Sequence, residues 1–164
     1  MKKISISLLL LLAVVCVSLG QNPSSPRVTA ESKNVKVEYG QPSKRGRVIF
    51  GELLPYGEVW RTGANQATEI TFAKDGTFGG KPVKKGTYTL FTIPAAREWT
   101  IILNSQLGQF GAFEYEQHKS KNVLEVLVAS RKTQAVVEKL SIRPTDTALV
   151  IEWDTTSVSV PLKF

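Results

Sequence analysis

The sequence predicts an all-β fold, a single-domain antiparallel β-sandwich of about eight to ten strands, with a β-barrel as the second choice. Apolar and polar residues alternate with a period of two in many short runs, the pattern of strands with one buried face. Turn-forming dipeptides separate these runs at close spacing. No window shows an apolar stripe of helical period over a useful length, so sheets must supply the core.

The first two thirds of the chain supply several short strands, which we expect at residues 34–39, 69–73, 77–78, 81–83, 86–93 and 99–103. Asp75-Gly76 closes one of them, since this dipeptide accepts the positive φ angles of a tight hairpin turn. Gly79-Gly80 suits a second tight turn. The run at 86–93 is apolar on both faces, as in a central strand, and Pro94 stops it.

The last third predicts further strands at 122–129 and 136–142, followed by a terminal hairpin. The two arms of the hairpin are 149–153 and 158–164, each with alternating apolar residues, and Thr155-Thr156 joins them. Before these strands, the polar residues 114–122 allow only a turn or two of helix.

The first twenty residues predict a signal peptide, with a positive start and an apolar stretch too short for a stable membrane span. Small residues favour cleavage near Gly20-Gln21. We favour plain secretion over lipidation at Cys16, because bulky valines precede that cysteine. The expected organisation is a signal peptide at 1–20, an extended leader at 21–33 and one β-sandwich domain at 34–164 of a secreted or periplasmic protein.

Composition excludes several classes of function. Cys16 is the only cysteine and leaves with the signal peptide, which excludes thiol catalysis, cysteine zinc sites and iron–sulfur clusters from the mature chain. The formal net charge of +7 falls to +5 (7 − 2) when Lys2 and Lys3 leave with the signal peptide. This excess could favour an anionic small molecule or polysaccharide as partner, but its more ordinary role is to keep a small secreted domain soluble. We expect no nucleic-acid partner, since no aromatic-basic recognition motif occurs, and no stable membrane span once the signal is removed. No cofactor is indicated, and the sequence does not indicate the oligomeric state.

The stretch VWRTGAN, residues 59–65, is the first candidate binding loop. Arg61 carries a planar guanidinium that pairs with carboxylate, phosphate or sulfate, and Trp60 offers a flat apolar face. Asn65 supplies both a donor and an acceptor. Alternatively, Trp60 is a core residue, Arg61 pairs with Glu58 or Glu69, and Asn65 bonds the loop's own backbone.

The stretch YGQPSKRGR, residues 39–47, is the second candidate loop. Lys44, Arg45 and Arg47 surround Gly46 and could bind an anion together with exposed backbone amides. The alternative is a solvated loop with no ligand, the ordinary role of a run of charges.

Glu114, Glu116 and His118 would share one face of a strand, where carboxylates and an imidazole can hold a divalent metal. We assign no metal site, because nothing supplies a fourth ligand. We assign no catalytic residue either, since His118 is the only histidine and no nucleophile elbow or phosphate-cradling loop occurs. An enzyme is therefore not the favoured reading.

The chain resembles a family of small secreted proteins of Gram-negative bacteria that is catalogued as a domain of unknown function. The blocks that carry the resemblance are SPRV, VEYGQPSKRGRVIFG, LPYGEVWRTGAN, ATEITF, GTYTLFTIP, EWTIILN and LGQFGAF, in this order along residues 25–113. The resemblance covers about residues 25–164. It implies an all-β fold and export, and it brings no established activity, cofactor or catalytic residue.

Our leading hypothesis is a non-enzymatic envelope binding module for an anionic or sugar-like ligand. Arg45, Arg47, Arg61 and Asn65 would gather around the ligand, with Trp60 or Tyr56 as a packing wall. One alternative is a hydrolase of envelope or imported polymers that uses Glu58 or Glu69 beside Arg61. Another is a structural or assembly protein of the envelope.

Overall fold

The computed structural model describes residues 25–164, so the predicted signal peptide and the question of lipidation at Cys16 lie outside the described residues. Within 25–164 the chain forms nine strands, one α-helix and one 3-10 helix. Their bounds are β1 Arg27–Glu31, β2 Val35–Gly40, β3 Thr68–Phe72, β4 Gly76–Phe78, β5 Lys81–Val83, β6 Gly86–Ile93, β7 Glu98–Asn104, α1 Tyr115–His118, η1 Lys119–Lys121, β8 Asn122–Pro144 and β9 Ala148–Lys163. No helix among these residues has the length or apolar character that crossing a bilayer requires.

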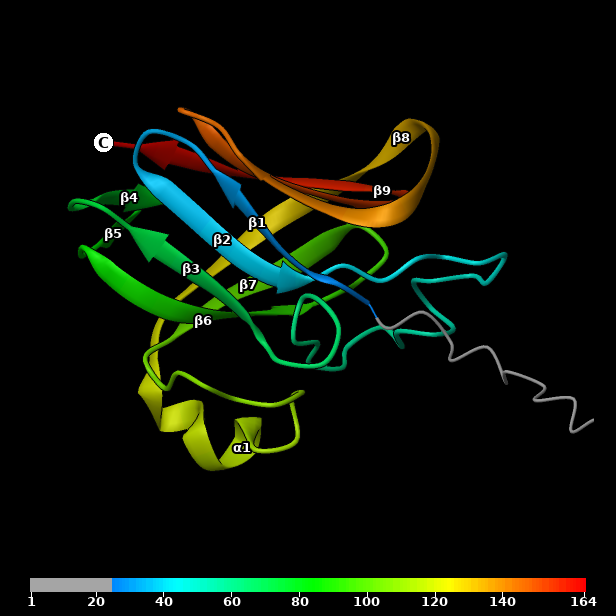
Figure 1. Cartoon of the computed structure of the whole chain (residues 1–164), viewed down its shortest axis with the longest axis horizontal. Helices are drawn as coiled ribbons and strands as arrows, with labels where there is room; N and C mark the ends of the chain where they lie inside the picture. Colours follow the sequence, from blue (N-terminus) through cyan, green and yellow to red (C-terminus); the bar gives the residue numbers. More distant parts are fainter. Residues whose placement is uncertain (1–24) are drawn as a thin grey trace, which may run out of the picture.

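All strand pairs are antiparallel, and the strands form one open sheet in the order β1-β2-β3-β6-β7-β8-β9-β4-β5. The sheet folds over itself, so that β8 and β9 face the layer of β2, β3, β6 and β7 (Figure 1). The all-β prediction is therefore confirmed, with nine strands in the described residues. The edge strand β1 falls inside the segment expected to be an extended leader, and it pairs with β2 through Arg27↔Gly40 to Glu31↔Lys36.

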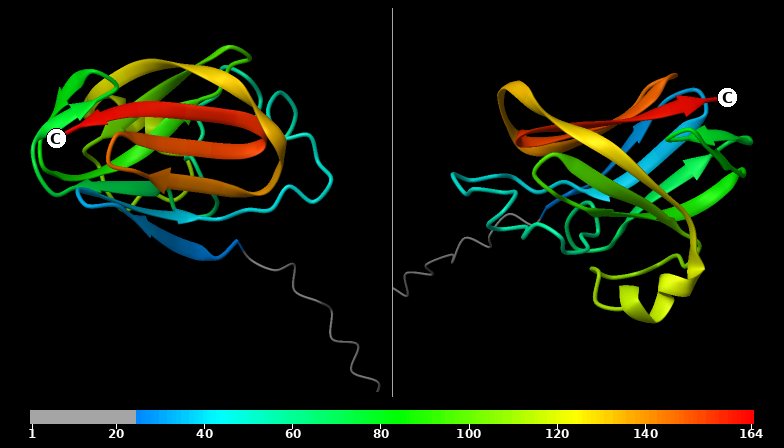
Figure 2. Two further views of the ribbon diagram at one scale, coloured as in Figure 1. Left: turned by 90° about the horizontal axis from the view of Figure 1, so that it is seen from above. Right: turned by 180° about the vertical axis from the view of Figure 1, so that it is seen from behind.

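The long strand β8 carries the chain from one layer to the other. Its first part pairs with β7, from Glu98↔Ala129 to Asn104↔Asn122, and its later part pairs with β9. Two register shifts, between Lys132 and Val137 and between Val137 and Ser141, interrupt the pairing with β9. Bulges of this kind bend a strand and increase its twist. The ribbon of β8 accordingly curls around one end of the molecule (Figure 2).

The predicted C-terminal hairpin is present within β9. The backbone N–H of Leu162 donates to the carbonyl of Thr147 at 2.8 Å, which is only possible if the ribbon reverses between them. The ribbon of β9 reverses direction in this way (Figure 2), and Asp154, which follows the first arm, has a positive φ of 55°. The two arms and the turn region thus agree with the sequence prediction.

The two glycine-containing turns differ in outcome. Gly79 and Gly80 have φ angles of 59° and 81° and join β4 to β5, as predicted. The hairpin expected at Asp75-Gly76 is wrong, because β4 pairs with β9 and β5 instead of β3. The Asp75 carboxylate accepts the backbone N–H of Lys85 and the ammonium of Lys84, both at 2.8 Å, and so closes a wider loop.

The core between the layers ends in a cluster of four aromatic rings. In five of the six pairs among Phe50, Trp60, Trp99 and Trp153, the ring centroids lie 4.8 to 6.3 Å apart. Trp60 and Trp153 are stacked at 6.0 Å with 21° between their planes. Edge-to-face and offset contacts of this kind stabilise a core beyond the area they bury. This cluster lies beneath the loops that hold both candidate stretches.

Candidate functional site

The long connection between β2 and β3 covers one end of the sandwich and contains both candidate stretches (Figure 1). Its first residues extend the sheet toward the second half of β8. Ser43 forms an antiparallel bridge with Lys139, Lys44 N donates to Glu138 O at 2.7 Å, and Leu140 N donates to Pro42 O at 3.0 Å. The connection is therefore anchored by the backbone of β8.

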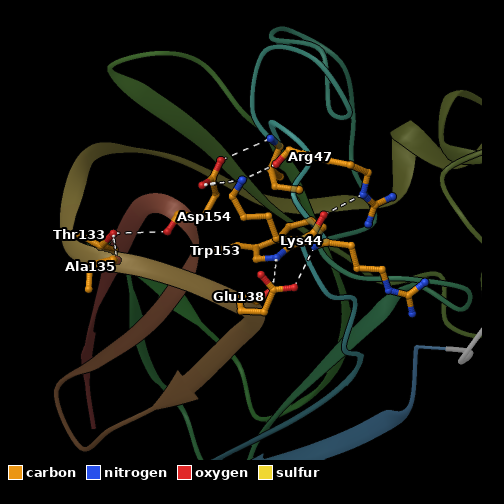
Figure 3. A network of polar contacts seen from close by, with 9 residues as sticks. Lys44, Arg47, Thr133, Ala135, Glu138, Trp153 and Asp154 are labelled. Atoms are coloured by element: carbon orange, nitrogen blue, oxygen red, sulfur yellow. Dashed lines mark hydrogen bonds and ion pairs between the residues drawn. The ribbon is translucent and has the colours of Figure 1, made fainter.

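A polar network fixes the basic loop on this anchor (Figure 3). Lys44 Nζ lies 3.5 Å from Asp154 Oδ1, and both side chains are mostly buried. The other oxygen of Asp154 accepts Ile49 N–H at 3.4 Å, while Glu138 Oε1 accepts Arg45 N–H at 2.8 Å. Lys44, which the sequence grouped with the ligand-binding arginines, is thus neutralised inside the scaffold. It positions the loop.

Arg45 and Gly46 turn the chain with positive φ angles of 50° and 71°. The turn brings Arg47 back over the loop, where its guanidinium donates to the carbonyls of Lys44 at 2.9 Å and Ser43 at 2.6 Å. These acceptors are neutral, and among the described residues no carboxylate forms an ion pair with Arg47. The guanidinium is therefore oriented but keeps its net charge.

The WRTGAN stretch is closed on its own backbone. Trp60 exchanges two backbone hydrogen bonds with Thr92 of β6, at 2.8 and 2.9 Å, and its indole N–H donates to Gly63 O at 3.0 Å. A Cβ on Gly63 would lie 2.9 Å from Thr68 Oγ1 and 3.1 Å from Gly40 O, so any larger residue would force these neighbours to shift. The glycine in this stretch is explained by close packing.

The two stretches meet at a cleft of about 380 Å³. Arg45, Arg47 and Arg61 all contribute to it, so the expected convergence of the three arginines is present. No acidic residue occurs among the described residues that line the cleft. The remaining lining residues are Ser25, Pro42, Ser43, Leu53, Leu54, Trp60, Gly63, Ala64 and Trp153.

Arg61 lines this cleft, and none of the carboxylates in residues 25–164 forms an ion pair with it. Its Nε atom is buried and has no hydrogen-bond partner in the described part of the chain. Burial lowers the pKa of the Arg61 guanidinium below its ordinary value, because the charged form loses hydration. The predicted alternative, a pairing of Arg61 with Glu58 or Glu69, is wrong. Glu69 accepts Gly108 N–H at 3.0 Å, and Glu58 only lines a neighbouring pocket of about 120 Å³ that Arg61 shares.

Two predicted ligand residues do not line the cleft. Asn65 has a positive φ of 62°, its amide reaches Ser25 O at 3.5 Å, and its carbonyl accepts Gly111 N–H at 2.9 Å. Its side chain therefore contacts the backbone of the segment before β1, and neither lines the cleft nor bonds the loop's own backbone as the alternative expected. The ring of Tyr56 lies over Gly51 and is 48% exposed. Trp60 does line the cleft, but it is also a core residue, only 5% exposed.

The comparisons with known proteins give a family and no activity. The family model described as "Protein of unknown function (DUF2911)" matches residues 22–162. The chain belongs to this family. No curated protein and no solved structure matches the chain. The resemblance to a domain of unknown function is therefore confirmed.

Sequence reasoning missed the contribution of β8 and β9 to the site. Trp153 forms part of the cleft wall and donates its indole N–H to Glu138 O at 3.2 Å. Glu138 and Asp154 hold the basic loop from a distance of more than 90 residues in sequence. These acceptors lie so far along the chain that no local sequence signal links them to the basic loop.

The acidic and histidine residues near α1 form no metal centre. Glu114 and His118 are four positions apart on a short helical segment, not on a strand, with 3.7 Å between Glu114 Oε2 and His118 Nε2. Glu116 pairs with Lys119 at 3.6 Å instead. Within residues 25–164, no three histidine, cysteine, aspartate or glutamate side chains are grouped to hold a metal ion.

Proposed function

We propose that the protein is a non-enzymatic binding module of the bacterial envelope that takes an anionic ligand in the arginine cleft. The observation that carries this proposal is the concentration of positive charge: three arginines line one cleft, and none of its described lining residues is acidic.

The buried Nε of Arg61, which has no hydrogen-bond partner among the described residues, has an energetic cost in the ligand-free protein. A buried hydrogen-bond donor without a partner destabilises a folded protein by about 1–3 kcal/mol, and more when the group is charged. Such a group does not stabilise the folded protein when no ligand is bound. An anion in the cleft would supply both the missing acceptor and the counter-charge, and guanidinium groups bind carboxylate, phosphate and sulfate in bidentate fashion.

The structure supports an aromatic packing wall for the ligand less than it supports contacts from arginines. Trp60 and Trp153 are 5% and 2% exposed, so neither presents a wide ring face for a sugar to stack on. The exposed apolar surface at the cleft is Leu53, at the rim. The charge of the ligand, more than an apolar body, is what the site would recognise.

Export is part of the same proposal and is supported by the sequence of residues 1–20. A positively charged start, an apolar stretch and small residues near Gly20 form the pattern of a secretory signal. We expect the mature protein in the periplasm or outside the cell. Fractionation of cells that express the full chain, with N-terminal sequencing of the product, tests this and should find a mature protein that begins near Gln21.

A thermal-shift screen tests anion binding, because a ligand that binds only the folded state raises the unfolding temperature. The screen uses sulfate, phosphate, citrate and galacturonate at constant ionic strength. At least one anion should stabilise the wild-type protein and lose its effect in Arg61→Ala. Arg143→Ala is the matched control, since Arg143 pairs with Glu152 at 2.9 Å outside the cleft. If no anion stabilises the wild type, or if both variants respond alike, the proposal is wrong.

The hydrolase alternative has one supporting observation, the pocket of about 120 Å³ that Glu58 and Arg61 share. A carboxylate beside an arginine can act as an acid or base when substrate lies between them. Release of reducing ends from cell-wall or capsular polysaccharide, abolished by Glu58→Gln, would favour it over pure binding. We favour binding, because the larger cleft has no acidic residue among its described lining residues.

A further inference from the structure

A second cleft continues the first one along the loop. It measures about 340 Å³ and shares Ser25, Ser43 and Arg45 with the arginine cleft. Its other lining residues are Pro26, Gln41, Glu138 and Lys139. Because three residues line both spaces, the two clefts are adjacent parts of one groove. We call this the basic groove, defined by the lining residues of both clefts.

Positive groups are distributed along the whole basic groove. Arg61 and Arg47 line only the first cleft, Arg45 lines both, and Lys139 lines only the second. The Lys139 side chain is exposed and forms no ion pair with the described residues. Glu138, the one acidic group among the described residues that line the groove, already accepts Arg45 N–H through Oε1. An elongated ligand with anionic groups at intervals matches this distribution better than a compact ion does.

The groove offers side chains, not a strand edge. Its walls, residues 42–44 and 138–140, bond to each other through Ser43↔Lys139, Lys44 N–Glu138 O and Leu140 N–Pro42 O. A peptide that binds by strand addition needs free backbone donors and acceptors, which this pairing has used. Ser25 and Ser43 instead provide hydroxyl groups. Gln41 donates through Nε2 to Leu140 O at 3.0 Å, and its amide oxygen can accept from a ligand hydroxyl.

From these observations we propose that the basic groove binds an elongated acidic oligosaccharide, with one anionic group at Arg61 and another near Lys139. This inference rests on the proposed anion-binding function and adds the length and class of the ligand. Neighbouring sugar units would place their hydroxyl groups against the serine and glutamine side chains. The arginines and the lysine would contact successive acidic groups.

Isothermal titration with uronates of increasing length tests the inference. The probes are galacturonate, digalacturonate and tetragalacturonate, with neutral maltotetraose and tetraglutamate as comparisons. We expect tetragalacturonate to bind at least about ten-fold more tightly than galacturonate, since the second cleft adds contacts. Lys139→Glu should weaken tetragalacturonate binding about ten-fold, because repulsion replaces a surface attraction, and leave galacturonate binding unchanged.

Lys74→Glu is the matched control, as it makes the same change in net charge on an exposed residue between β3 and β4, at the other end of the sandwich (Figure 1). It should leave both affinities unchanged. Thermal melts establish that each variant is folded.

The outcomes separate this inference from the proposed function. If galacturonate and tetragalacturonate bind equally tightly, or if Lys139→Glu and Lys74→Glu behave alike, the extended groove is wrong while anion binding stands. The same holds if only phosphate or sulfate binds. Tighter binding of tetraglutamate than of tetragalacturonate would identify a peptide ligand and overturn the saccharide class. If no anion binds in titration or thermal shift, both proposals fail.

Discussion

Replacing Arg61 with methionine should make the ligand-free protein more stable. Methionine keeps an unbranched apolar stem of similar reach, so most of the packing of the arginine chain is retained. The substitution removes a positive group whose Nε is buried without a hydrogen-bond partner and which faces no carboxylate in the described cleft lining. In the absence of ligand, the main effect of this group on the free energy of unfolding is therefore the cost of removing it from water.

The expected gain follows from the cost of an unsatisfied buried donor, about 1–3 kcal/mol. Arg61 is half-buried, so part of its guanidinium remains hydrated and the lower end of that range applies. We expect the free energy of unfolding to rise by about 1 kcal/mol. For a domain of this size, 1 kcal/mol corresponds to a rise in the unfolding temperature of roughly 3 °C.

Urea denaturation in a buffer of weakly binding anions measures this change, with Arg143→Met as the control for loss of an exposed arginine. The control should change the free energy of unfolding by less than about 0.5 kcal/mol, since exposed ion pairs contribute little. Adding the best anion from the thermal-shift screen should reverse the order, stabilising the wild type and not Arg61→Met. A loss of more than about 1 kcal/mol in Arg61→Met without ligand would show that the guanidinium is structural and would refute this reasoning.

Three further predictions concern the scaffold of the site. Gly40→Ala should lower the free energy of unfolding by about 2 kcal/mol or more, because the added Cβ would lie 2.1 Å from Ala64 O. Gly46→Ala should lower it by only about 1 kcal/mol, the cost of a φ of 71°, since no atom lies near its Cβ. Urea denaturation of the two variants compares these values. Asp154→Ala should lower the free energy of unfolding by about 2 kcal/mol, and Asp154→Asn should lower it by about half as much. Asparagine tolerates the φ of 55° and keeps an acceptor for Ile49 N–H. Urea denaturation distinguishes the two variants. The pKa of Asp75 is lowered below its ordinary 3.8 by hydrogen bonds from Lys84 and from Lys85 N–H, so its stabilisation is present above that value and is lost as the pH falls below it. Asp75→Asn should therefore flatten the acid part of the stability profile, and an unchanged profile would contradict this.

Local pattern was sufficient for most strands and failed where a strand's partner lies far along the chain. The runs at 86–93 and 98–104 show their burial directly in the alternation or continuity of apolar residues, and both are strands. The turn at Asp75-Gly76 was mispredicted because its geometry depends on the C-terminus. A Cβ on Gly76 would lie 2.4 Å from Lys163 O, so the approach of β9 decides the path there. Local sequence contains no information about that approach.

The site was predictable to a similar extent. The convergence of Arg45, Arg47 and Arg61 followed from two candidate stretches that lie within one connection, between β2 and β3. The separate role of Lys44 did not, since only the fold brings Asp154 to it. Asn65 was assigned to the ligand from its residue type. Its left-handed backbone instead directs the amide toward Ser25 O.

The anchoring of the basic loop by β8 and β9 has a consequence for folding. The contacts that hold the loop include two between residues 93 and 105 positions apart, Arg45 with Glu138 and Ile49 with Asp154. Closing loops of this length is slow, and sheets dominated by such contacts are among the slower-folding topologies. The groove can exist only after the C-terminal strands have docked, so binding competence should be the last property acquired during refolding. An isolated peptide that spans both basic stretches would have the residues of the site but not the site itself.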